Sequence, residues 1–354
     1  MSKRIVAVLS AIALALVLSA PTAIAQKKVL LKVPIAFATS LPGLGTTIKY
    51  VSDQVNAVPE MGINMRIYEP GKLVAPFEIL DAVSTGKTNA GFTTAGYWAG
   101  KMTASPLFSA VPFGPEADEY LAWFLYGNGM KLYQEMYDSS GFHVKVLLCG
   151  MIAPETSGWF TKPINSADDL KGLKMRFFGL GGEVMQKLGV STSLLPGGEI
   201  FPALEKKAID ATEFSMPAID EKLGFYKIAN YNYYPGWHQQ ATSFELLINK
   251  DTWNDMSKSQ QTFLEMACRD GITNSIAEGE AIQFAVIKRN NERGINSVYW
   301  SQDMLALFEK TWGEVAQELS AKDAFFKKVY ADLSAFRADY AEWKKRAFLP
   351  RATN

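Results

Sequence analysis

An arginine and a glutamate stand out in the segment from residue 174 to 214, where most neighbours are apolar residues or glycines. Arg176 lies in the sequence KMRFF, and Glu213 lies in the sequence DATEF. A guanidinium group is planar and always charged, so Arg176 can form two parallel hydrogen bonds to a carboxylate. The residues alone leave two interpretations open: the arginine binds a carboxylate ligand, or it forms an ion pair with an acidic neighbour.

Glu213 is a carboxylate in a strand pattern that is otherwise apolar. Burying such a group costs several kcal/mol of desolvation unless a cation accompanies it. Hard cations such as Na⁺ and Ca²⁺ bind carboxylate, amide and backbone oxygens. Glu213 is therefore a candidate ligand of a metal ion.

The elements around these two residues predict a parallel sheet. Short bulky runs alternate with helical patterns and glycine turns: strand 174–178, helix 183–188, strand 190–195, helix 199–207 and strand 209–214. Such a βαβαβ order is typical of parallel sheets, in which ligands lie beyond the carboxyl ends of the strands. Arg176 and Glu213 fall in the first and third strands, so we expect them to face one pocket.

The rest of the chain shows the same kind of alternation. We expect strands at 29–37, 65–68, 89–94, 144–150 and 243–249, and helices at 45–56, 77–85, 120–138, 257–293 and 301–347. Crossings between two lobes are predicted near residues 150 and 240. The last helical stretch is too long for one small lobe, so we expect it to brace both and to offer a surface for a homodimer.

Two adjacent aromatics, Tyr97 and Trp98, follow the predicted strand at 89–94 in the sequence GYWAG. Their place after the carboxyl end of a strand suits a pocket wall. Ordinary core packing is the alternative, because aromatic side chains mostly serve cores. Both residues are included among the candidates for substrate binding.

Several kinds of chemistry lack the residues that they need. The predicted mature chain contains two histidines, His143 and His238, and no Cys-x-x-Cys pair. The residues that a zinc site built from histidines or a Ser-His-Asp triad needs are therefore scarce. The sequence STGKT ends like a phosphate-binding loop, but Asp81 stands where that motif needs its first glycine. We expect no enzyme activity; His238 is a candidate to line the cleft.

The N-terminus and composition indicate an exported protein. Residues 1–25 combine Lys3 and Arg4, an apolar run and a small-residue cleavage pattern, which predicts a signal peptide. Without those two basic residues, 34 of the 36 basic side chains remain against 36 acidic ones, so nothing favours binding to nucleic acid. Cys149 and Cys268 could form a disulfide in that compartment or remain as buried thiols, and the sequence leaves this open.

The motif string from GLKMRFFGLGGEVMQKLGVSTSLLPGGEIFPALEKKAIDATEF to DEKLGFYKIANYNYYPGW resembles the solute-binding proteins of tripartite ATP-independent periplasmic (TRAP) transporters, the DctP-like family. Within it, the chain is most similar to the branch that binds 2-oxo or 2-hydroxy monocarboxylates together with a metal ion. The resemblance implies an α/β, two-lobed periplasmic binding protein fold with a central cleft and long C-terminal helices. The expected parts are a first lobe at 26–150 and about 241–300, a second lobe at 151–240, and bracing or dimerisation helices at 301–354.

The resemblance also implies roles for single residues. Arg176 matches the arginine that clamps the substrate carboxylate. Glu213, the backbone carbonyl of Phe214 and the side-chain oxygen of Gln239 match the metal ligands. Glu155 departs from the pattern, because relatives carry an amide or a similar polar group there, so it is a candidate to touch both metal and solute. That carboxylate could favour Ca²⁺ over Na⁺ or accept a hydrogen bond from a hydroxyl group, which leaves the metal and the acid open.

The implied function is that of an extracytoplasmic receptor in the periplasm. It would capture a small organic acid, such as pyruvate or lactate, with one Na⁺ or Ca²⁺ ion and deliver it to the membrane subunits of a TRAP transporter. One alternative is a periplasmic enzyme that uses Glu155 and Glu213 as an acid and base pair. A second alternative is a sensor that passes the bound solute's signal to a membrane receptor.

Overall fold

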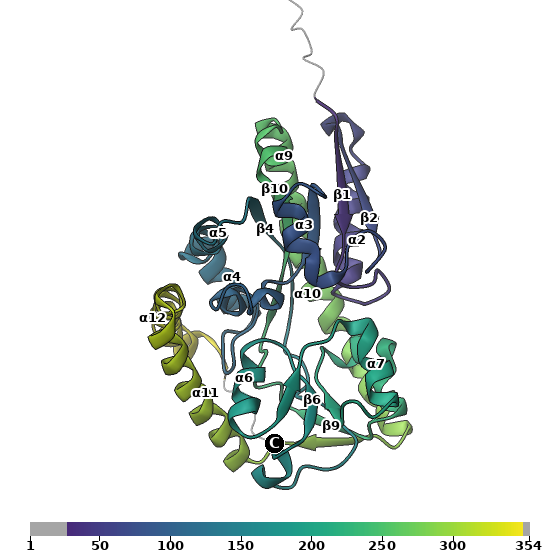
Figure 1. Ribbon diagram of the computed structural model, residues 1–354, viewed down its shortest axis with the longest axis vertical. Helices are drawn as coiled ribbons and strands as arrows, with labels where there is room; N and C mark the ends of the chain where they lie inside the picture. Colours follow the sequence, from purple (N-terminus) through teal and green to yellow (C-terminus); the bar gives the residue numbers. More distant parts are fainter. Residues whose placement is uncertain (1–26, 350–354) are drawn as a thin grey trace, which may run out of the picture.

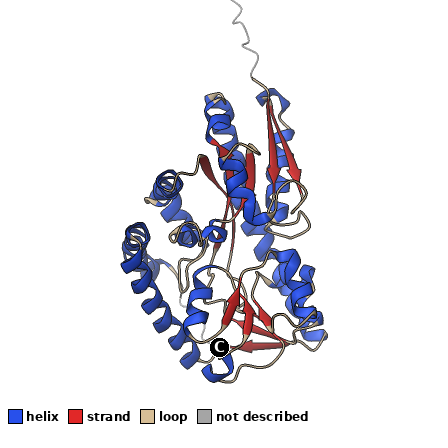
Figure 2. Cartoon of the chain, viewed as in Figure 1, coloured by secondary structure: helices blue, strands red, loops and turns tan. Residues whose placement is uncertain are grey.

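The computed structural model describes residues 27–349, so the predicted signal peptide lies outside the described residues. Helices and strands alternate through the two halves of the molecule (Figure 1, Figure 2). Within the described range, none of the helices has the length and apolar character needed to span a bilayer. The α/β class expected from the sequence is confirmed.

The first lobe contains two small sheets. The strands are β1 (Val29–Pro34), β2 (Ile63–Tyr68), β3 (Ala90–Thr93), β4 (Val144–Ile152) and β10 (Thr242–Asn249). β1 and β2 are parallel, and a parallel bridge from Ile35 to Phe92 links them to β3, as the alternation predicted. β10 lies between β3 and β4, antiparallel to both, and is buried along its whole length. A later segment of the chain therefore forms the centre of this lobe.

The second lobe is built on a six-stranded sheet in the order β11-β9-β5-β8-β6-β7. Its strands are β5 (Gly158–Phe160), β6 (Lys174–Arg176), β7 (Ser191–Ser193), β8 (Ala211–Thr212), β9 (Tyr231–Tyr234) and β11 (Asn296–Tyr299). β6 is parallel to both β7 and β8, which confirms the predicted βαβαβ unit with its helices α6 (Gly179–Lys187) and α7 (Gly197–Glu205). We had expected the range from about 241 to 300 to lie in the first lobe. However, β11 pairs with β9, so residues 296–299 belong to the sheet of the second lobe.

Two short segments connect the lobes beside each other. Residues 153–157 lead from β4 to β5, and residues 235–241 lead from β9 to β10. The backbone N–H of Glu155 donates to the carbonyl of Gln239 at 3.2 Å, so the two segments are hydrogen-bonded to each other. Both lie where the sequence predicted the crossings, and both supply candidate site residues.

The long helix α10 (Lys258–Glu292) packs against β4 and also reaches the second lobe, where it contacts α8 (Pro217–Leu223). The predicted cap at its start is confirmed, because the hydroxyl of Ser257 accepts from the backbone N–H of Gln260. Cys149 in β4 and Cys268 in α10 form a disulfide. The sequence had left open whether these two cysteines form a disulfide or remain as buried thiols, and the structure contains the disulfide.

The predicted helix at 120–138 is two helices, α4 (Ala117–Tyr126) and α5 (Gly129–Ser139). The break occurs at Gly127, whose backbone is extended at φ −90° and ψ −153°. A Cβ atom there would come within 2.7 Å of the Trp123 carbonyl oxygen in the last turn of α4, so the way the chain leaves this helix favours glycine. Trp123 and its aromatic neighbours lie in the core, in agreement with the absence of a predicted site role.

The last two helices, α11 (Gln302–Lys322) and α12 (Ala324–Ala347), run along one side of both lobes (Figure 1). In the second lobe, Lys187 of α6 forms an ion pair with Glu318 of α11. In the first lobe, the indole N–H of Trp123 donates to Asp332 of α12 at 2.8 Å. The two C-terminal helices therefore contact both lobes.

Candidate functional site

A small pocket lies where the two connecting segments meet the carboxyl ends of β3 and β6. It holds about 280 Å³ of space that protein atoms do not fill. Residues from both lobes line it: Phe37, Leu44, Thr94, Tyr97, Glu155, Arg176, Phe178, Phe214, Ser215, Gln239, Thr242 and Phe244. The pocket is small and lined closely by side chains, so it suits a ligand of few atoms.

Arg176 ends strand β6 and is almost completely buried, with 1% of its side chain exposed. Its Nε donates to the carbonyl of Leu195 at 3.2 Å. Its Nη1 donates to both the carbonyl and Oε1 of Glu213, each at 2.7 Å. Nη2 donates no hydrogen bond within the described part of the chain. Arg176 thus forms an ion pair with an acidic neighbour, Glu213, which was one of the two interpretations left open by the sequence. Arg176 also lines the pocket, where its Nη2 can donate to a ligand.

Glu213 follows β8 directly, because the third strand of the unit ends at Thr212 rather than at the predicted residue 214. Its Oε1 accepts from Arg176 and from the backbone N–H of Phe178 at 2.5 Å. Burial alone would raise the pKa of this carboxyl group, but Arg176, His238 and the Phe178 N–H together hold the pKa below its ordinary value. Glu213 is therefore an ionised carboxylate, and its Oε2 accepts no hydrogen bond.

Glu155 lies on the first connecting segment and is also buried. Its Oε1 accepts two long hydrogen bonds, from Ser215 Oγ at 3.4 Å and from Thr242 Oγ1 at 3.2 Å, and its Oε2 has no partner. Burial raises the pKa of Glu155 well above its ordinary value, and the nearby charges of Glu213 and Asp220 raise it further. This carboxylate lacks the cation that would stabilise its charge.

Gln239 lies on the second connecting segment, opposite Glu155. Its Nε2 donates to Thr242 Oγ1 at 2.7 Å, which leaves its buried Oε1 without a hydrogen bond. Phe214 lines the pocket with its ring beneath the guanidinium of Arg176, 5.1 Å from the Arg176 Cζ atom to the ring centroid. Phe214 and Gln239 therefore line the same pocket as Arg176, which contacts Glu213.

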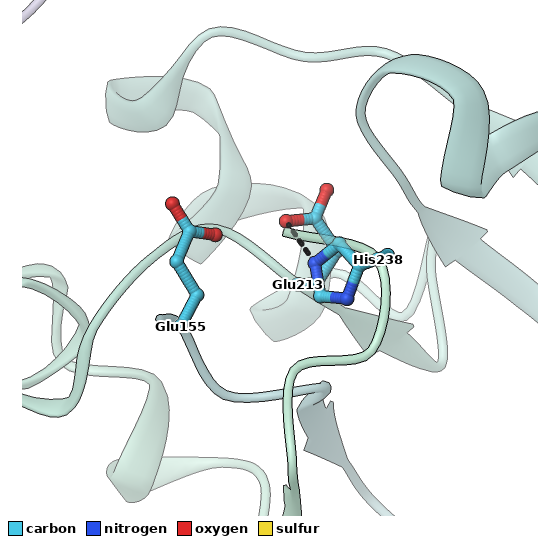
Figure 3. Close-up of side chains that lie close together, drawn as sticks. All are labelled: Glu155, Glu213 and His238. Atoms are coloured by element: carbon cyan, nitrogen blue, oxygen red, sulfur yellow. Dashed lines mark ion pairs between the residues drawn. The ribbon is translucent and has the colours of Figure 1, made fainter. Parts of the chain in front are cut away.

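Glu155, Glu213 and His238 could hold a metal ion among them, because one ligand atom from each lies within 4.8 Å of the others (Figure 3). The sequence offered His238 only as a residue of the cleft. Both of its ring nitrogens lack a hydrogen bond, and its Nε2 lies 3.5 Å from Glu213 Oε2. Buried polar atoms without partners are rare in proteins, so their gathering here fits a cation site.

The two predicted aromatic residues have different positions. Tyr97 lines the pocket, and burial raises the pKa of its hydroxyl to about 12. Trp98 lies behind this wall, where its indole N–H donates to Glu245 at 3.0 Å. Trp98 is therefore not among the residues that line the pocket, although it is adjacent to Tyr97 in the turn at 95–98.

Seven lining residues had no predicted role: Phe37, Leu44, Thr94, Phe178, Ser215, Thr242 and Phe244. Phe37 and Thr94 come at the ends of predicted strands, and the rule that ligands lie beyond the carboxyl ends could have identified them. Ser215 and Thr242 carry hydroxyl groups that contact Glu155, which periodicity does not reveal.

Comparison with known proteins places these features in a family. Residues 39–323 match the family described as bacterial extracellular solute-binding protein, family 7 (DctP). The chain is 36% identical over 303 residues to a monocarboxylate 2-oxoacid-binding periplasmic protein of Nostoc sp., an alignment that covers 86% of this chain and 82% of the relative.

Solved TRAP solute-binding proteins have the same fold. A protein from Bordetella bronchiseptica, a dimer with calcium and picolinate, is 30% identical with a TM-score of 0.88, over 91% of this chain and 95% of its own. A Colwellia psychrerythraea protein with calcium and pyruvate is 29% identical with a TM-score of 0.86, over 91% and 98% of the two chains. A Pseudoalteromonas atlantica protein with sodium and pyruvate is 30% identical with a TM-score of 0.85, over 91% and 97%.

These relatives are transport receptors, which agrees with the expectation that this chain is not an enzyme. The two-lobed binding protein fold with long C-terminal helices is likewise confirmed. The chain belongs to the DctP family of extracellular solute-binding proteins and is a solute receptor of the TRAP transporter type.

Proposed function

We propose that this chain binds a small 2-oxo or 2-hydroxy monocarboxylate, of the pyruvate or lactate class, together with one metal ion in the periplasm. The observation that carries the proposal is the combination of one free guanidinium edge and several free oxygens around a single pocket. Arg176 Nη2 offers donors to a carboxylate, and Glu155, Glu213 and Gln239 each offer an oxygen without a partner. An anion and a cation are both needed to satisfy such a set.

Arg176 holds the carboxylate of the solute in this proposal. Glu213 fixes the guanidinium through Nη1, and the carbonyl of Leu195 fixes it through Nε, so the edge that meets the solute is oriented before binding. A guanidinium held in this way loses little side-chain entropy when the solute arrives. The ion pair is thus part of the binding machinery.

The metal ion would be held by Glu213, the backbone carbonyl of Phe214 and the side-chain oxygen of Gln239, with Glu155 as a further contact. When bound, it neutralises carboxylate charge and attracts the solute's 2-oxo or 2-hydroxy oxygen. The residues fit such an ion because their unpaired atoms are oxygens, which Na⁺ and Ca²⁺ prefer.

Aromatic rings limit the size of the solute. Tyr97 packs edge to face on Phe178 with ring centroids 5.6 Å apart, and Phe37 packs on Phe244 at 5.4 Å. These rings form much of the pocket wall, so a short aliphatic chain fits there better than a polar sugar acid. They also shield the charged groups from water, which strengthens the interactions among them.

Delivery to the transporter would depend on closure of the two lobes. The lining residues come from both lobes, so a bound solute stabilises the closed arrangement over the open one. The membrane subunits of a TRAP transporter would then recognise the closed receptor. In this proposal the signal peptide at residues 1–25 is removed on export.

Isothermal titration calorimetry of the purified mature chain tests the proposal. Pyruvate, lactate and longer 2-oxo acids are titrated before and after metal removal with a chelator, and D-glucuronate serves as the control solute. We expect heat from at least one short monocarboxylate, loss of binding with chelator, and recovery when metal is restored. No heat from any monocarboxylate in the presence of sodium and calcium would refute the proposed function.

A further inference from the structure

We infer that the cation site takes a divalent, oxygen-preferring ion of the calcium class, and that Glu155 sets this preference over a monovalent ion. The inference depends on the proposed function and specifies its metal. Sequence similarity to the solved relatives does not decide between calcium and sodium. The Colwellia psychrerythraea protein holds calcium with pyruvate and the Pseudoalteromonas atlantica protein holds sodium with pyruvate, yet they are 29% and 30% identical to this chain.

The buried charges around the pocket favour a divalent ion. Arg176 and Glu213 form a direct ion pair at 2.7 Å, so their charges balance each other. A carboxyl group that binds a metal ion is deprotonated, so Glu155 carries a negative charge when it holds the ion. Glu155 forms no ion pair with a basic side chain of the described residues, and the solute brings a second negative charge. A divalent ion balances these two charges, whereas a monovalent ion leaves one negative charge buried, which is costly.

Two other ionisable groups near the site do not change this balance in favour of sodium. Asp220 is fully buried and accepts only from neutral donors, Trp159 Nε1 and the Ser215 N–H, so ionisation there would add negative charge. Histidine binds a metal ion as a neutral imidazole, so His238 as a ligand would add no charge to the count. The charge count therefore depends on Glu155.

The free oxygens also suit calcium in type and number. Glu155 Oε2, Glu213 Oε2 and Gln239 Oε1 are buried without hydrogen bonds, and the Phe214 carbonyl is the fourth candidate oxygen. A 2-oxo acid offers one carboxylate oxygen and its keto oxygen as two more, which reaches the lower end of calcium's usual range of about six to eight oxygens. His238 is the one nitrogen in the group, so a nitrogen-preferring ion is less well matched.

Glu155 can be tested by an isosteric change. Glu155→Gln keeps the side-chain length and an oxygen that can face the ion, but it removes the charge. Because the present Oε1 accepts only two long hydrogen bonds, at 3.4 and 3.2 Å, little other structure depends on the carboxylate. Glu199→Gln on the exposed surface of α7 is the matched control.

The experiment measures pyruvate affinity by calorimetry on chelator-treated protein at one fixed pH. Each variant is titrated with millimolar calcium, with excess sodium, and with neither ion. Direct calcium titration without solute gives a second readout, and thermal unfolding checks that each variant is folded. We expect the wild type and Glu199→Gln to bind pyruvate at least about tenfold more tightly with calcium than with sodium, and Glu155→Gln to lose this preference while it still binds with sodium.

Three results would overturn the inference. Equal pyruvate affinity of the wild type with sodium and with calcium would show that the ion's charge is not selected. A calcium preference that persists in Glu155→Gln would assign the selection to other groups. Tight Co²⁺ binding with a visible ligand-field spectrum that His238→Ala abolishes, without calcium binding, would assign a nitrogen-preferring ion. If no monocarboxylate binds with any metal, the proposed function fails and this inference fails with it.

Discussion

Glu245 provides a test of the electrostatics behind the pocket wall. It lies in β10, fully buried, and its carboxyl group accepts hydrogen bonds from the Trp98 indole at 3.0 Å, from the Tyr137 hydroxyl at 2.8 Å and from the Tyr133 hydroxyl. Burial raises its pKa from 4.5 to about 7, against the opposing effect of these hydrogen bonds. The group is therefore neutral in the folded protein at pH values where it is charged in the unfolded chain.

The sign of the effect follows from this raised pKa. The stability that the neutral carboxyl contributes is fully present below pH 4.5 and is lost as the pH rises through about 7. A difference of about 2.5 pH units corresponds to roughly 3 kcal/mol of unfolding free energy, of which roughly 2.5 kcal/mol is lost between about pH 5 and pH 8. Glu245→Gln is neutral at every pH, so it avoids this loss.

Denaturant unfolding at several pH values, with the disulfide intact and solute absent, measures the effect. The free energy of unfolding of Glu245→Gln minus that of the wild type should rise by roughly 2.5 kcal/mol from about pH 5 to pH 8. Any change in hydrogen bonding caused by the amide is nearly constant with pH and cancels in this comparison. Glu60→Gln, at an exposed position, is the control and should parallel the wild type. A Glu245→Gln curve that also parallels the wild type would refute the reasoning.

Three further predictions concern the site, the disulfide and the tail. Arg176→Met should abolish detectable pyruvate binding in calorimetry and lower the unfolding free energy by about 3–5 kcal/mol, because Glu213 loses its buried partner; unchanged binding would exclude Arg176 as the carboxylate clamp. Replacing Cys149 and Cys268 by serine should cost about 2–5 kcal/mol in denaturant unfolding, because the disulfide closes a loop across a separation of 119 residues; an unchanged midpoint would contradict this. Light scattering should give the mass of two chains at micromolar concentration and that of one chain for Trp343→Asp, since Trp343 is 60% exposed on α12; a monomeric wild type would exclude the proposed dimer.

The pairing of Arg176 with Glu213 was predictable because it depends on local order in the sequence. Glycine turns and short bulky runs marked a parallel βαβαβ unit, and the first and third strands of that unit, β6 and β8, are neighbours in the sheet. Residues at the ends of adjacent parallel strands necessarily lie close together. The same local rule placed the connecting segments that carry Glu155 and Gln239.

The features that the sequence missed depend on contacts between distant segments. β11 pairs with β9 although residues 235–295 separate them in the chain. Cys149 and Cys268 form a disulfide because α10 packs on β4. Trp98 and Tyr97 are both large aromatic residues at adjacent positions, so only the geometry of their turn decides which one lines the pocket. The break at Gly127 likewise depends on the backbone conformation at the end of α4, which the apolar periodicity does not reveal.

The central claim is that Arg176 and a metal ion hold the same small acid from two sides. A crystal structure of the mature protein grown with pyruvate and calcium, with anomalous diffraction to locate the ion, tests it most directly. We predict a calcium peak about 2.3–2.6 Å from oxygens of Glu213, Gln239 and pyruvate, with the pyruvate carboxylate hydrogen-bonded to Arg176. A pyruvate molecule bound without any metal contact, or an ion in a different pocket, would contradict the account.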